Sequence, residues 1–323
     1  ESLWSGASSS GSGVATAAGL CFAALGSDTG GSIRFPAMAN GIVGLKPTYG
    51  RVSRFGVLPL AESMDHVGPM TRRVADAAAM LQAMAGQDEN DSTTLTESLP
   101  DLLTGLDTGI EGLRIGFDPA FSDTGTDVGL VVAIEQALEA LQGLGAELVE
   151  VRMPAETAQL GDAWFAICAY EAYRAHAPKL GSTANAFGPF FRDFLAIGAS
   201  ITDEQYAGAS QLREAFNQPF HAVLESVDAM VCPSGGMTLP IEQAMLYGDR
   251  EAIEPLFAAV QMQFTVPADF AGTPTLTVPC GFADDGRPYA FQFMGRRLSE
   301  QTLCRFGHAY EGATGWHERH PPV

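Results

Sequence analysis

Basic side chains are scarce in this chain of 323 residues. Lysine and arginine together number 18 against 38 aspartates and glutamates, which gives a formal net charge of −20 and a pI near 4.5. Such an acidic surface repels a phosphate backbone, so we expect no direct nucleic-acid partner. The sequence also has no basic amphipathic stretch and no apolar run of about 18 residues, so we expect no association with a membrane.

Cysteine and histidine are also sparse. The five cysteines are an odd number, widely spaced, with no C-x-x-C pair, which argues against both a disulfide framework and a zinc site. The six histidines are scattered, and no acidic cluster stands near them at metal-ligand spacing. We therefore expect free thiols in a reducing cytoplasm, no metal and no cofactor.

Hydrophobic residues make up 46% of the chain, and glycine occupies 36 positions, which is typical of a compact, tightly turned enzyme. A first buried strand is expected at 20–25 and an amphipathic helix at 74–85. Residues 113–151 predict a strand–helix–strand unit, which implies parallel pairing. This alternation predicts an α/β fold with a large mixed β-sheet covered by helices on both faces. We expect one domain over 1–323, with a mostly helical region at 157–265 that shapes a substrate pocket.

Two Ser/Gly-rich loops, at 2–13 and 26–34, hold the residues best suited to chemistry. The strand expected at 20–25 leads into the second loop (GSDTGGSIR), in which Gly30 and Gly31 precede Ser32. Paired glycines allow backbone conformations in which several N–H groups point at one anion. A serine at the end of such a nest can attack a carbonyl whose oxygen the nest holds. The spacings of a phosphate-binding loop, a dinucleotide fingerprint and an α/β-hydrolase elbow are absent, which leaves a purely structural glycine turn as the alternative.

Residues 6–56 contain a long, ordered block of motifs. GASSSGSG, GSDTGGSIRFP and GLKPTYGR follow one another there. The block resembles the signature sequence of the amidase signature family, and residues 65–70 and 267–279 are similar to two further motifs of that family. The resemblance implies the amidase signature fold and the activity of a serine amidohydrolase.

The resemblance also assigns roles to single residues. Ser32 matches the family nucleophile, and Ser8 matches a bridging serine that follows a cis peptide bond, which we expect between Ala7 and Ser8. Ser8 is then expected to relay the proton of Ser32 to a neutral lysine while Ser32 attacks the amide carbon. The N–H groups expected to form the oxyanion hole belong to Thr29, Gly30, Gly31 and Ser32. The residues expected to support the two loops are Asp28, Arg34 and Ser9.

The chain departs from the family pattern at two places. It contains only Lys46 and Lys179, and neither matches the catalytic lysine of the family. We therefore expect that lysine to lie outside residues 1–323, in a preceding segment or on another chain, so that the fold is incomplete at its N-terminus. Ser10 stands where the family usually has glycine, which points to the branch that acts on biuret, carbamates and urethanes.

We thus expect a cytoplasmic hydrolase of linear C–N bonds, acting on a small-molecule amide, carbamate or urea-like substrate through an acyl-enzyme on Ser32. A homodimer is one possible assembly. Two alternatives stay open: an amidotransferase subunit that uses glutamine and passes ammonia to a glutamyl-tRNA partner, and a non-catalytic family member that acts as a scaffold. Four aromatic residues in the helical region belong either to the pocket or to the core: Trp164, Phe165, Tyr170 and Tyr173.

Overall fold

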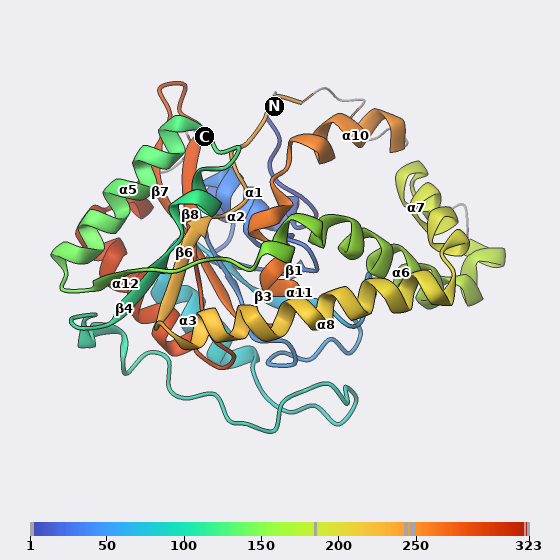
Figure 1. Cartoon of the computed structure of the whole chain (residues 1–323), viewed down its shortest axis with the longest axis horizontal. Coiled ribbons are helices and arrows are strands. Elements are labelled where there is room, and N and C mark those ends of the chain that lie inside the picture. The colour runs from blue at the N-terminus through green and yellow to red at the C-terminus, as the bar shows by residue number, and fades with distance from the viewer. Residues whose placement is uncertain (1–2, 184–185, 242–244, 246–249, 320, 322–323) are drawn as a thin grey trace.

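The structure, a computed structural model, describes residues 3–183, 186–241, 245, 250–319 and 321. In this part of the chain, eight strands form one sheet in the order β1-β3-β2-β7-β8-β6-β4-β5 (Figure 1). The strands are β1 (Ala23–Asp28), β2 (Val43–Lys46), β3 (His66–Thr71), β4 (Arg114–Phe117), β5 (Glu147–Glu150), β6 (Ala229–Pro233), β7 (Thr275–Phe282) and β8 (Pro288–Met294). β4 pairs in parallel with β5 and β6, whereas the other pairs are antiparallel. The predicted mixed sheet is therefore confirmed.

The strand–helix–strand unit predicted at 113–151 is also confirmed, because α5 (Val128–Gly143) connects the parallel strands β4 and β5. The prediction of a first strand at 20–25 is wrong by three residues, since β1 spans Ala23–Asp28. Leu20 and Phe22 are 80% and 88% exposed. The apolar run therefore begins at the surface before the strand, so hydrophobicity alone misplaced its start.

Helices cover both faces of the sheet, as predicted. One hydrophobic core contains residues of α3 (Val74–Met84), α5 and α12 (Glu300–Thr314), and the other contains residues of α6 (Leu160–Thr183), α8 (Asp203–Glu225) and α11 (Val266–Phe270). Successive side chains of β6 show the division: Val231 packs in the first core, while Met230 and Cys232 pack in the second. Alternation of this kind follows from the pleat of a strand whose two faces are both buried.

The helical region predicted at 157–265 is largely helical where the structure describes it, with β6 as its one strand. Its helices α6, α7 (Pro189–Ser200), α8 and α10 (Arg250–Ala259) extend to one side of the sheet (Figure 1). Pro189 begins α7 at a position where its missing N–H costs nothing, and Thr202 caps α8 by accepting from Gln205 N. The role of this region in shaping a pocket stays a prediction.

The first Ser/Gly-rich loop lies along the outer side of β1, which is an edge strand of the sheet. Ser9 Oγ accepts from Ser27 N at 3.1 Å and donates to Ser27 O at 3.2 Å. Ser12 Oγ, in α1 (Ser10–Ala17), donates to Leu25 O at 2.6 Å. These hydroxyl groups hold the first loop against the strand that leads into the second.

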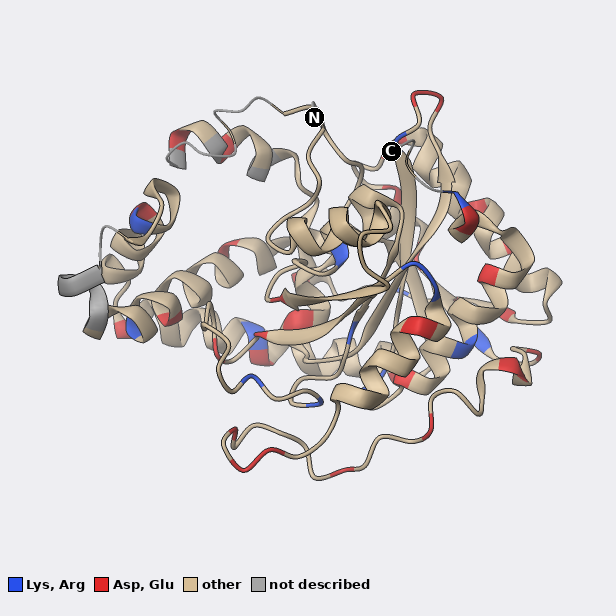
Figure 2. Ribbon diagram, turned by 180° about the vertical axis from the view of Figure 1, so that it is seen from behind, with Lys and Arg blue, Asp and Glu red and all other residues tan. Residues whose placement is uncertain are grey.

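Charged side chains are spread over the helices and the long connection between α3 and β4, with aspartate and glutamate in excess (Figure 2). Among the described helices, none combines the length and the apolar character needed to cross a membrane. Nor do the described residues include a group of three or more His, Cys, Asp or Glu side chains able to hold a metal ion.

Candidate active site

The two loops meet at the C-terminal end of β1. Ser9 N donates to Ser32 O at 3.3 Å, and a Cβ atom on Gly6 would overlap the backbone of Pro36 in α2 (Arg34–Asn40). The peptide bond between Ala7 and Ser8 is cis, as predicted. Ser8 is exposed and Ser32 is partly exposed. The structure thus places the segments that carry both predicted serines side by side at an accessible position.

The loop over residues 29–32 has all four of its carbonyl oxygens occupied. The donors are Trp164 Nε1 to Thr29 O at 2.7 Å, Thr265 Oγ1 to Gly30 O at 2.7 Å, Phe35 N to Gly31 O at 2.7 Å and Ser9 N to Ser32 O at 3.3 Å. By contrast, no acceptor in the described part of the chain takes the N–H groups of Thr29, Gly30 or Ser32. Backbone N–H groups that lack an acceptor beside a serine are what a developing oxyanion requires.

Gly31 behaves differently from its neighbours. Its N–H donates to Asp28 Oδ1 at 2.7 Å, so it is occupied in this structure although the motif grouped it with the oxyanion donors. Its φ is +125°, and a Cβ atom there would overlap the ring of Phe35. A Cβ atom on Gly30 would lie 2.5 Å from the ring of Trp164. Both glycines are therefore required by the path of the loop.

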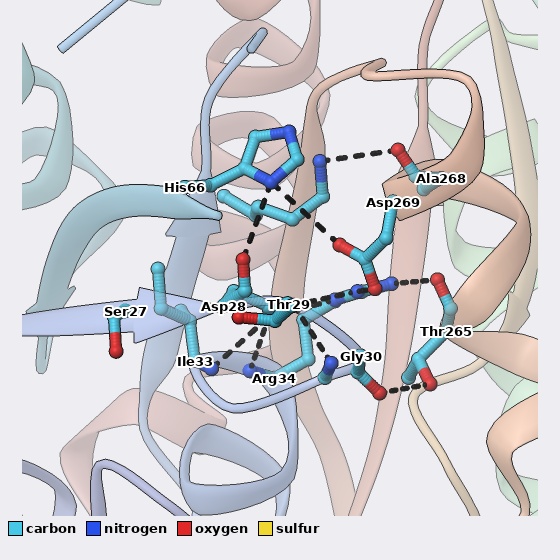
Figure 3. A network of polar contacts seen from close by, with 12 residues as sticks. Ser27, Asp28, Thr29, Gly30, Ile33, Arg34, His66, Thr265, Ala268 and Asp269 are labelled. Carbon is cyan, nitrogen blue, oxygen red and sulfur yellow. Dashed lines mark hydrogen bonds and ion pairs between the residues drawn. The ribbon is translucent and has the colours of Figure 1, made fainter. Parts of the chain in front are cut away.

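Asp28 and Arg34 brace the loop from inside the protein, and neither is exposed (Figure 3). Besides Gly31 N, Asp28 accepts from Ile33 N at 3.0 Å and from Arg34 Nε and Nη2 at 3.1 and 2.9 Å. Burial alone would raise the pKa of Asp28, but the Arg34 guanidinium holds it well below its usual range. Asp28 is therefore an anion that fixes the turn, which is the bracing position predicted for it.

Further polar side chains lie behind this brace (Figure 3). His66 Nδ1 lies 3.2 Å from Asp28 O, and burial, with the charge on Lys46, lowers the pKa of His66 well below its usual range. A neutral His66 can donate to that carbonyl through Nδ1. Asp269 Oδ2 accepts from Arg34 Nη2 at 2.7 Å. Thr29 Oγ1 donates to Asp65 Oδ1 at 2.6 Å, which ties the start of the loop to a third buried acid.

Of the two lysines of the chain, Lys46 makes no hydrogen bond to either predicted serine among the described residues. Lys46 is buried, and its Nζ donates to Ala268 O at 3.3 Å and to Thr273 O at 2.5 Å. Burial lowers the pKa of Lys46 to about 8. The side chain of Lys179 lies outside the described residues.

Sequence reasoning missed several residues that hold the loop. Thr265, Asp269 and Gln292 contact either the loop or Arg34, yet they come from the last fifth of the chain. Their signal was weak, although Asp269 falls inside the motif recognised at 267–279.

Four aromatic residues of the helical region were expected to belong either to the pocket or to the core. Of these, Trp164 lies against Gly30 at the loop, whereas Tyr170 stacks on Tyr206 within the helical region.

Known proteins resemble this chain in sequence. The family model described as Amidase matches residues 1–304. The chain is 40% identical to the A subunit of the glutamyl-tRNA(Gln) amidotransferase of Prochlorococcus marinus (strain MIT 9303), and the match covers 98% of this chain and 69% of the relative.

Solved structures with related sequences have the same fold. The corresponding glutamyl-tRNA(Gln) amidotransferase polypeptide from Thermotoga maritima has a TM-score of 0.82 at 31% identity, over 97% of this chain and 67% of that one. The peptide amidase of Stenotrophomonas maltophilia has a TM-score of 0.80 at 33% identity, over 99% and 67% of the two chains. The chain therefore belongs to the amidase signature family.

Proposed function

We propose that the protein cleaves a C–N bond of an amide through an acyl-enzyme on Ser32. The observation that carries this proposal is the loop at 29–32, whose carbonyl oxygens are all occupied while three of its N–H groups have no acceptor among the described residues. In the proposed reaction, Ser32 Oγ attacks the amide carbon, and the N–H groups of Thr29, Gly30 and Ser32 stabilise the oxyanion. Each such donor contributes about 3–4 kcal/mol in enzymes of known mechanism. Gly31 is left out of the proposed hole because its N–H already donates to Asp28.

Proton transfer in the proposal runs through Ser8. As Ser32 Oγ bonds to the carbon, its proton passes to Ser8 and the Ser8 proton passes to a neutral lysine. Ser8 then gives a proton to the departing nitrogen and takes back the proton held by the lysine, the C–N bond breaks, and water hydrolyses the acyl-enzyme. Lys46 does not fit the role of this lysine, because its Nζ already donates to two carbonyl oxygens behind the loop. Hydrogen bonds between catalytic groups are often long before substrate binds, which is consistent with the lack of a hydrogen bond from the hydroxyl group of Ser8 or Ser32 to any described residue.

We propose glutamine as the amide donor, and we propose that the biological role is that of an amidotransferase subunit. The support is the 40% identity to the glutamyl-tRNA(Gln) amidotransferase polypeptide of Prochlorococcus marinus, which extends over 98% of this chain. In this role the ammonia passes to a partner protein in the cytoplasm. A net charge of −20 favours contact with a partner protein over direct contact with tRNA.

A hydrolase of small amides is the second candidate, favoured by the likeness to a peptide amidase at 33% identity. The carbamate and urethane branch has less support, because the names of the relatives given above refer to amidotransferases and a peptide amidase. In addition, Ser10 Oγ donates to Gly6 O at the start of α1. That hydrogen bond explains the serine at position 10 by local structure, so Ser10 is no longer an indication of the substrate class.

The test uses the full-length protein purified from its native source, together with any subunits that remain bound to it. A serine-reactive fluorophosphonate probe is expected to label the wild type and not the Ser32→Ala variant. The preparation is then assayed with glutamine, peptide amides, aryl amides and carbamates. Glutamate release from glutamine supports the amidotransferase role, whereas turnover of peptide or aryl amides alone supports the second candidate. A native mass measurement on the same sample tests the predicted homodimer, and a complete lack of labelling would favour the scaffold alternative.

A further inference from the structure

A buried group of charged and titratable side chains lies behind the proposed oxyanion loop (Figure 3). Its centre is Arg34, whose five N–H groups all have acceptors. The acceptors are Asp28 Oδ2 for Nε, Thr265 O and Gln292 Oε1 for Nη1, and Asp28 Oδ1 and Asp269 Oδ2 for Nη2. One guanidinium thus serves two carboxyl groups, and both of these are fully buried.

The two carboxyl groups are not equivalent. Asp28 has four donors at 3.1 Å or less, two from the backbone of the loop and two from Arg34. Asp269 has one, and its buried Oδ1 has no partner among the described residues. His66 Nδ1 lies 3.8 Å from that oxygen, beyond hydrogen-bond distance, and is already directed at Asp28 O. A buried carboxylate oxygen without a donor is costly, whereas a carboxylic acid in the same place needs fewer donors.

The surroundings of Asp269 favour the acid. Burial raises its pKa well above the usual range, the Asp28 carboxylate adds to the rise, and Arg34 and Lys46 oppose it. Both carboxyl groups accept from the same nitrogen, Arg34 Nη2, at 2.9 and 2.7 Å, so they lie beside each other and a proton on Asp269 can be directed at Asp28. The groups that face Asp269 from the elements packed around α11 are Asp28 (β1), Arg34 (α2), Lys46 (β2), His66 (β3), Cys168 (α6) and Arg213 (α8).

We propose that Asp269 is a positioning residue of the Ser32 site and that it acts as a neutral carboxylic acid. Asp269 Oδ2 accepts a hydrogen bond from Arg34, and the carboxylic acid of Asp269 donates a hydrogen bond to Asp28. These two contacts keep Arg34 hydrogen-bonded to Asp28, and the turn at 29–32 therefore keeps its shape. The inference rests on the proposed function for its catalytic consequence, but the arrangement of Arg34 and Asp28 exists without it.

Two substitutions separate a neutral acid from a second carboxylate. Asp269→Asn keeps the shape, keeps an oxygen for Arg34 and puts an N–H₂ donor where the proposal puts the O–H. Asp269→Ala removes both contacts. Asp285→Asn is the matched control, because it makes the same chemical change at an exposed side chain in the turn between β7 and β8.

Three readouts on the purified protein decide the matter. First, the infrared spectrum at neutral pH is expected to contain the band of a protonated carboxylic acid, lost in Asp269→Asn and kept in Asp285→Asn. Second, amide hydrogen exchange of residues 28–34 is expected to match the wild type in Asp269→Asn and to be faster by about tenfold or more in Asp269→Ala. Third, the rate of fluorophosphonate labelling is expected to stay within about threefold in Asp269→Asn and to fall about ten- to hundredfold in Asp269→Ala.

The absence of the acid band, or equal losses in the Asn and Ala variants, would overturn the proposal. A wild-type protein that is never labelled would instead refute the proposed function. In that case the infrared and exchange results still decide whether Asp269 is neutral and whether it shapes the loop.

Discussion

Replacing Arg34 by methionine is the sharpest test of how this loop is held. The side chain is fully buried, so its removal takes away all five of its hydrogen bonds and leaves the anionic Asp28 without the cation that it contacts directly, with Lys46 as its remaining positive neighbour. Methionine is unbranched and fills much of the volume of the arginine side chain, so the loss of stability is mainly electrostatic. Removing one partner of a buried ion pair costs about 3–5 kcal/mol of unfolding free energy.

The dependence of that loss on pH is the decisive measurement. In the wild type, the pKa of Asp28 is held well below its usual range, so Asp28 stabilises the fold above the unfolded-state pKa of about 3.9 and loses this contribution only below it. Without Arg34, burial raises the pKa of Asp28. The folded variant then holds a proton that the unfolded chain has lost, so its stability falls as the pH rises above about 4. The deficit relative to the wild type should grow by about 1.4 kcal/mol for each pH unit over which the proton is held.

Urea denaturation followed by circular dichroism, at about pH 5 and about pH 7.5, measures this growth. The control is Arg287→Met, which breaks an ion pair at the surface and should change stability little at either pH. If the Arg34→Met deficit were the same at both values, Asp28 would not depend on Arg34 for its charge, and the bracing argument would fail.

Three further substitutions test the site itself. Ser32→Ala should abolish fluorophosphonate labelling and lower the rate of amide cleavage by about a thousandfold or more while leaving the thermal transition in place, and retained labelling would move the nucleophile elsewhere. Gly31→Ala forces a Cβ atom onto the ring of Phe35 at a φ of +125°, so it should cost about 1–3 kcal/mol in denaturant unfolding, and an unchanged midpoint would contradict the loop path. Trp164→Phe keeps a ring over the loop but deletes the 2.7 Å hydrogen bond to Thr29 O. It should lower the free energy of unfolding by about 1 kcal/mol and slow fluorophosphonate labelling. No change in either quantity would contradict a structural role for that hydrogen bond.

Much of the fold followed from the sequence because the strand and helix periods were clear. The unit around α5 was recognisable from its two apolar segments and the helix between them. The order of the strands was not, because β2 pairs with β7, which lies some 230 positions later in the chain at Leu45 opposite Leu276. Residue patterns report which face of an element is buried, but they do not report which strand lies beside it.

The candidate site divides in the same way. Ser8, Asp28 and Ser32 lie in one continuous block, so the resemblance placed them together and also predicted the cis bond before Ser8. The resemblance did not identify Trp164 and Thr265 as supports of the loop. Each makes a single hydrogen bond to the loop from a largely apolar helix or turn. Such a residue looks like any other core or loop residue until the backbone brings it to the carbonyl oxygen that it serves.

The serine hydroxyls along β1 have a consequence for solubility as well as for geometry. An edge strand with open N–H and C=O groups invites pairing with another chain, and here Leu25 on that strand is 54% exposed. Ser9 and Ser12 occupy three of those backbone groups with side chains that cannot extend a sheet. The first Ser/Gly-rich loop therefore also protects this edge against pairing with another chain, so a substitution at Ser9 is expected to favour aggregation as well as to disturb the site.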